Sequence, residues 1–98
     1  MTREYLRGEV LLLLDRMQDA APGFGGARTV AALRRDAETV PVGSLAPVLR
    51  RALEATESWC WEALAADDAA GFRCRCQVAA GLYDFGVCSG LLADKDTD

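Results

Sequence analysis

The stretch that decides the fold is SLAPVLRRALEATESWCWEALAA, residues 44–66. Its apolar residues recur every three or four positions, which is the spacing of one face of an α-helix. Ser44 is a suitable N-cap, and Pro47 is compatible with a first turn, where a missing backbone N–H is tolerated. We therefore expect a helix from Leu45 to about Ala66. Its core-facing stripe comprises Leu45, Val48, Leu49, Ala52, Leu53, Thr56, Trp59, Cys60, Ala63 and Leu64.

The same spacing predicts three further helices, which are separated by clear breaks. APGFGGA at residues 21–27 holds one proline and three glycines, a composition that interrupts a helix. VPVGS at residues 40–44 is the next break, and Asp67 or Asp68 would cap the final helix. We expect these helices at about residues 2–21, 28–39 and 70–93. Because short connections join antiparallel neighbours, the sequence predicts an all-α fold, a small antiparallel four-helix bundle.

The expected final helix is unusual because most of its circumference is apolar or small. Its few polar residues gather in one narrow arc when each residue is placed about 100° further round the axis. A helix with this pattern is buried on most sides, so we expect a largely buried C-terminal helix at the centre of the bundle. Arg75 would then need an acidic partner or an opening to solvent. The alternative is that Gly86 or Gly90 ends the helix early.

Size and composition predict a single helical domain, residues 1–98, with a short disordered tail at residues 94–98. The chain is 51% hydrophobic and 27% charged, which is typical of a globular protein. Its net charge of −4 disfavours nucleic-acid binding, which usually needs a basic surplus. The apolar run VLLLL at residues 10–14 is too short for a signal sequence or a membrane span. We expect an acidic cytoplasmic protein that binds neither nucleic acid nor membrane, and the excess of Ala and Arg suggests a bacterial source.

The four cysteines leave open a metal site, a disulfide or simple packing. On a helix, Cys74 and Cys76 point about 200° apart and cannot both bind one zinc ion. The chain has no histidine and no Cys-x₂-Cys motif, so we expect no metal and no cofactor. If the last turn centres near Asp67, Cys60 faces Cys74. This pair would pack as small hydrophobic residues or, in oxidising surroundings, act as a redox pair.

Two tryptophans stand two positions apart and therefore face different sides of their helix. Trp59 belongs to the core stripe, whereas Trp61 falls on the charged side with Glu57. On the first helix, Tyr5 and Leu12 stand seven positions apart on a face opposite the main stripe. Monomers rarely leave large apolar patches uncovered, and Trp is enriched at binding hot spots. We therefore predict an interaction surface that comprises Trp61, Tyr5, Leu12 and Glu57. The alternative is that Trp61 lies under an arginine stem or over a helix end, and that the second helix covers Leu12.

The sequence predicts a protein without catalysis. No cysteine has a histidine or another acid–base partner that would activate it, and the apolar stripes contain no carboxylates. We therefore expect a small interaction or regulatory protein whose partner is another protein or a second copy, as in a homodimer. Two alternatives stay open. One is a small-molecule-binding helical module with a pocket near Trp59, Phe72 and Tyr83, and the other is a cysteine-based redox or metal sensor.

Overall fold

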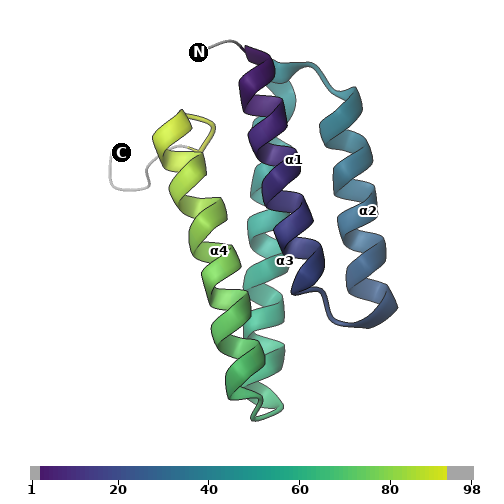
Figure 1. Cartoon of the computed structure of the whole chain (residues 1–98), viewed down its shortest axis with the longest axis vertical. Helices are drawn as coiled ribbons and strands as arrows, with labels where there is room; N and C mark the ends of the chain where they lie inside the picture. The colour runs from purple at the N-terminus through teal and green to yellow at the C-terminus, as the bar shows by residue number, and fades with distance from the viewer. Residues whose placement is uncertain (1–2, 93–98) are drawn as a thin grey trace.

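The computed structural model describes residues 3–92, which form four α-helices and one short 3₁₀ turn. The elements are α1 (Arg3–Asp19), α2 (Gly23–Thr39), η1 (Val42–Ser44), α3 (Leu45–Ala65) and α4 (Ala69–Ser89). No strand occurs within residues 3–92, so the all-α prediction is confirmed. Figure 1 shows that the chain reverses direction at each connection between consecutive α-helices. No helix in this part of the chain has the length and apolar character that crossing a membrane requires.

The middle of the molecule is formed by α1 and α3, each of which contacts all the other α-helices. The two remaining helices, α2 and α4, flank this pair and do not contact each other (Figure 1). The most extensive helix–helix contact is between α3 and α4. These two helices form a hairpin that projects beyond the connection between α1 and α2 (Figure 1). The projecting part on both sides of the turn at Asp67 is called the hairpin end below, and it consists of two helices only.

The core lies between α1, α2 and α3 and is closed by the C-terminal half of α4. Its buried residues are Val10, Leu13, Leu14, Met17, Val30, Leu33, Ala37, Leu45, Val48, Leu49, Ala52, Trp59, Leu82 and Leu92. Trp59 is 7% exposed, so the prediction that it faces the core is confirmed. Thr56 is also buried, and its hydroxyl donates to the carbonyl of Ala52 at 2.8 Å. This bond satisfies the hydroxyl inside an apolar environment.

The prediction of a largely buried C-terminal helix is wrong. Within α4 only Leu82 and Gly86 are buried, and the helix lies at the side of the bundle rather than at its centre (Figure 1). Much of its apolar pattern comes from small residues such as Ala70 and Ala80, which are exposed. Each alanine presents little apolar area to water, so its exposure is readily tolerated.

The C-terminal end of α4 follows the alternative boundary, with Gly90 ending the helix. Gly90 has φ +82°, a left-handed conformation that favours glycine. The chain then turns back, and the N–H of Leu92 donates to the carbonyl of Gly86 at 2.9 Å. A Cβ at Gly86 would lie 3.1 Å from Leu49 Cδ2 and closer still to Leu92. Glycine at position 86 therefore permits the return, whereas the predicted tail at residues 94–98 lies outside the described residues.

The start of α2 also differs from the prediction, because the helix begins at Gly23 and not near Arg28. The N–H of Gly26 donates to the carbonyl of Pro22 at 3.1 Å. A Cβ at Gly26 would lie 2.7 Å from Pro22 Cδ and 3.1 Å from Ala21 Cβ. The absence of a side chain at Gly26 thus lets the first turn of α2 pack against the preceding segment, so this glycine lies inside the helix instead of ending it.

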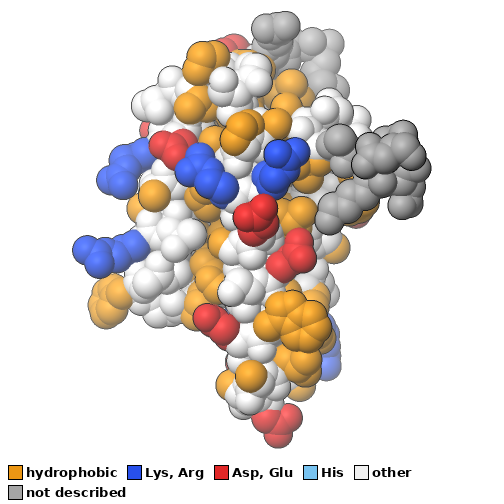
Figure 2. All heavy atoms as spheres, turned by 180° about the vertical axis from the view of Figure 1, so that it is seen from behind, with side chains coloured by type: hydrophobic (Ala, Val, Ile, Leu, Met, Phe, Trp, Pro, Cys, Tyr) orange, Lys and Arg blue, Asp and Glu red, His pale blue; other side chains and the backbone are white. Residues whose placement is uncertain are grey.

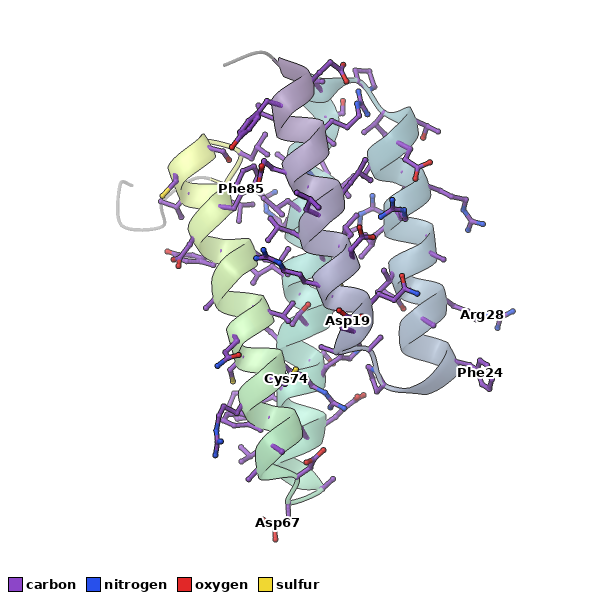
Figure 3. All side chains as sticks on the ribbon, viewed as in Figure 1. Asp19, Phe24, Arg28, Asp67, Cys74 and Phe85 are labelled. Carbon is purple, nitrogen blue, oxygen red and sulfur yellow. The ribbon has the colours of Figure 1, made fainter. Side chains whose placement is uncertain are left out.

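Ser44 and Asp68 lie at the predicted N-cap positions of the two hairpin helices, but only Asp68 caps its helix with its side chain. Ser44 occupies the N-cap position of α3, although its side chain makes no capping hydrogen bond. Asp68 caps α4, with its Oδ1 accepting the N–H of Gly71 at 2.9 Å. Asp67 has φ +57° and forms the tight turn between the helices. In Figure 3, Asp67 marks the extreme tip of the hairpin end.

Candidate functional site

Six large hydrophobic side chains are exposed in the described part of the chain. They are Tyr5, Leu12, Phe24, Trp61, Leu64 and Tyr83. Phe24 projects from the start of α2 away from the bundle (Figure 3). Trp61 and Leu64 lie on the C-terminal half of α3, one helical turn apart, so both reach the same side of that helix. Of the six, these two lie at the hairpin end and give it its apolar surface.

Two adjoining hollows on the hairpin connect these side chains with α4. One hollow, of about 250 Å³, is lined by residues that include Trp61, Phe72 and Cys76. The other, of about 360 Å³, is lined by residues that include Leu64, Phe72 and Cys76. Because Phe72 and Cys76 line both, the surface is continuous, and Trp61, Leu64, Phe72 and Cys76 are called the hairpin groove below. Figure 2 shows hydrophobic side chains gathered over this end of the molecule.

The rim of the hairpin groove is acidic. Between Ala52 and Phe72 the chain carries Glu54, Glu57, Glu62, Asp67 and Asp68 and no basic residue. Glu57 lines the hollow beside Trp61, and Asp67 and Asp68 line the hollow beside Leu64. The ion pairs found within residues 3–92 are all formed by α1, α2 and the first half of α3, so none of them involves these carboxylates. Among the described residues, Arg73 is the one basic residue that lines either hollow.

The structure brings together two of the four predicted interaction residues. Trp61 and Glu57 line the same hollow, and Trp61 is 68% exposed. Tyr5 and Leu12 are exposed on α1, and neither lines the hollows of the hairpin groove. The negative charge of Glu9 raises the pKa of Tyr5. Leu12 is 55% exposed, so α2 does not cover it.

Three residues of the hairpin groove, Leu64, Phe72 and Cys76, were not among the predicted interaction residues. Leu64 was expected on the core stripe of α3 but is 51% exposed, because α1 and α2 end before they reach the hairpin end (Figure 1). Phe72 is half-buried against the same end of α3. A sign of Leu64 and Phe72 was present in the sequence, since they are the large apolar residues nearest the connection at residues 66–68 on its two sides.

The thiol that faces Cys60 is Cys76, and not Cys74 as expected. The Sγ atoms of Cys60 and Cys76 lie 3.7 Å apart, and both residues are thiols rather than a disulfide. The connection at residues 66–68 is centred on Asp67, as assumed, but the side of α4 that faces Cys60 carries Cys76 and not Cys74. Cys74 is exposed and lines a separate hollow with Arg16 and Gln77. The proposed Cys60–Cys74 pair is thus replaced by a Cys60–Cys76 pair.

The surroundings of Cys60 favour its neutral thiol. Burial, followed by the hydrogen bond and the proximity of Cys76, raises the pKa of Cys60 to about 11 from the usual 9.0. The positive charge of Arg75 acts in the opposite direction but is outweighed. The Arg75 guanidinium donates through Nη1 to the carbonyl of Trp59 at 2.8 Å, so a backbone carbonyl takes the place of the acidic partner considered for it. No three side chains among His, Cys, Asp and Glu are grouped for metal binding within residues 3–92.

Comparison of the chain with protein-family models, with curated proteins and with solved structures found no match.

Proposed function

We propose that this is a non-catalytic interaction or regulatory protein, built as an antiparallel four-helix bundle, that binds a protein partner through the hairpin groove. The observation that supports this proposal is the 68% exposure of Trp61 within a continuous apolar groove. Large aromatic side chains at the centre of an apolar patch are the usual hot spots of protein interfaces. Burying such a side chain contributes about 1.5–3 kcal/mol, a gain that becomes available when a partner covers it.

The rim charges indicate what the partner presents. Glu57 and Asp67 lie at opposite ends of the groove, and Glu62 is exposed on the same segment of α3. A helical segment with one apolar face and basic residues beside it would complement both the groove and its rim. We propose an amphipathic basic segment of another protein as the occupant.

A second copy of the chain is the less favourable occupant of the same groove. A twofold contact places the same surface patch of each copy against the other. Such a contact through the hairpin groove would bring the acidic rims of the two copies together, and like charges at an interface are unfavourable. The homodimer that the sequence also suggested is therefore the less favoured possibility, and sedimentation distinguishes it from binding of a basic partner.

The test uses two synthetic amphipathic helical peptides with the same leucine face, one flanked by lysines and the other by glutamates. We expect the lysine peptide to bind and to shift the emission of Trp61, with an affinity that falls as salt is added. Trp61→Glu should weaken binding at least about tenfold, because about 1.4 kcal/mol of lost interaction corresponds to a factor of ten. Phe24→Glu is the matched control, since it replaces an exposed aromatic outside the groove.

Three outcomes would contradict the proposed partner. The first is that neither peptide binds, and the second is that both bind equally well. The third is that Trp61→Glu and Phe24→Glu bind like the wild type. Sedimentation tests the other occupant, because a wild-type dimer that Trp61→Glu dissociates would show that the groove binds a second copy.

A small-molecule-binding module is a second candidate, favoured by the hollow of about 360 Å³ at the tip of the hairpin. This volume is at the lower end of the range for ligand pockets. Phe72 lines it, whereas Trp59 and Tyr83, which were expected in such a pocket, do not. Trp61 does not line it either, so a ligand bound there should be lost in Phe72→Ala and retained in Trp61→Glu. The two variants therefore distinguish the two candidates.

A further inference from the structure

Cys60 and Cys76 form a side-chain pair that the proposed interaction does not require. They project from different helices, α3 and α4, and their Sγ atoms are 3.7 Å apart. A disulfide needs about 2.05 Å between the sulfurs, so the two side chains must approach each other to form one. The helices that hold them make the most extensive contact in the molecule. Both residues line the hollow beside Trp61, so a small reagent can reach the pair.

We propose that Cys60 and Cys76 are an oxidisable thiol pair, which low-molecular-weight disulfides convert to an intramolecular disulfide between α3 and α4. This inference does not depend on the groove binding a partner. Disulfides in reducing compartments are usually transient and redox-sensing, which is the behaviour expected of a pair reached from the protein surface.

The reaction begins at Cys76, which is half-buried and lines both hollows, whereas Cys60 is buried. The Cys76 thiolate attacks one sulfur of the reagent RSSR, forms a mixed disulfide and releases RS⁻, which takes up a proton. Cys60 then loses its proton to solvent and attacks the Cys76 sulfur, which breaks the mixed bond and releases the second RS⁻. The protein loses two protons and two electrons, and RSSR becomes two RSH. The high pKa of Cys60, about 11, keeps it from being the first to react.

The other two cysteines cannot replace either member of the pair. Cys74 is two positions from Cys76 on the same helix and points about 200° away. It lies beside Arg16 of α1, on a different side of α4. Cys88 is exposed and stands about 18 Å further along the helix axis from Cys76. The pairing of Cys60 with Cys76 is therefore specific within the folded monomer.

The test starts from the variant Cys74→Ser/Cys88→Ser, which retains only the proposed pair. The folded protein is treated with oxidised glutathione under anaerobic conditions, and its intact mass is measured after an acid quench. We expect the loss of two hydrogens with no glutathione retained. Trypsin cleaves after Arg51, Arg73, Arg75 and Lys95, so digestion should give one linked species that joins peptides 52–73 and 76–95.

Single-thiol variants in the same background establish the order of reaction. Cys60→Ala should retain a stable glutathione adduct on Cys76, because no second thiol is present to displace it. Cys76→Ala should be modified at Cys60 at least about tenfold more slowly, as a mostly protonated buried thiol is a poor nucleophile.

Three results would overturn the proposal. The first is that the Cys74→Ser/Cys88→Ser variant retains glutathione. The second is that it keeps both thiols under conditions that modify Cys60→Ala, and the third is that it forms disulfide-linked dimers instead of an internal disulfide. Far-UV circular dichroism of each variant before oxidation verifies that the helices are intact, and a Cys60→Ser variant provides a second substitution at the buried site.

Discussion

Replacing Trp59 by alanine should lower the free energy of unfolding by about 3–5 kcal/mol, the range for truncating a large buried aromatic. Trp59 is 7% exposed and belongs to the core cluster. A buried aromatic removes roughly 150–250 Å² from water. At roughly 25 cal/mol per Å² this area corresponds to about 4–6 kcal/mol before the neighbours relax. Small domains are stable by about 5–15 kcal/mol, so the loss would be a large fraction of the total.

The matched control is Trp61→Ala, which removes the same side chain two positions along the same helix. Trp61 is 68% exposed, so only about a third of its surface is buried. On the same area argument, Trp61→Ala should lower the free energy of unfolding by no more than about 1–2 kcal/mol. Urea unfolding followed by far-UV circular dichroism measures both. With a slope of about 2 kcal/mol per molar, the midpoint of Trp59→Ala should fall by about 2 M. Equal midpoints for the two variants would refute the assignment of these two faces of α3.

Two further predictions concern α4 and the thiol pair. Gly86→Ala should destabilise the protein by about 1–3 kcal/mol, because its Cβ would overlap Leu92 and approach Leu49. Gly81→Ala should stabilise the protein by about 0.5–1 kcal/mol, because the new Cβ meets only Leu13 Cδ2 at 3.9 Å. Thermal unfolding midpoints that shift in the same direction for both variants would contradict these two expectations. Because the folded protein holds the pKa of Cys60 at about 11 against 9.0, its thiol should contribute stability that is fully present below pH 9 and is lost as the pH rises through 11. The difference in urea midpoint between wild type and Cys60→Ala should change over that interval, and a constant difference would show that Cys60 is not desolvated.

The number and approximate positions of the helices were predictable because the apolar spacing is strong where large residues carry it. On α3 this spacing separates Trp59 from Trp61 correctly, since two positions correspond to about 200° around the axis. On α4 the same reasoning was wrong about burial. Alanine and glycine count as apolar or small in a sequence pattern, but they occur on both the buried and the exposed side of a helix. Only packing with the other helices shows that Ala70 and Ala80 face outward.

The hairpin groove was only partly predictable, and the reason is the unequal length of the helical pairs. Leu64 has the spacing of a core residue, yet α1 and α2 do not extend far enough to cover it (Figure 1). The thiol pair depended on which side of α4 faces α3. Cys74 and Cys76 point about 200° apart on α4, and it is Cys76 that lies next to Cys60. Periodicity defines the faces of each helix, but it does not define how far one helix extends past another or the register between them.

The separation of α2 from α4 has a consequence for how the native state fluctuates. Because α4 contacts only α1 and α3 among the α-helices, the hairpin end can open without moving the core around Leu14 and Leu49. Local opening of this kind has a lower free energy than global unfolding, and it lets backbone amides exchange with solvent while the rest of the fold persists. The amides at the start of α4 should thus exchange sooner than those around Leu82, which is fully buried. Faster exchange there would mean that the part of the molecule that opens first also carries the hairpin groove, and a ligand can then select among the shapes that this opening produces.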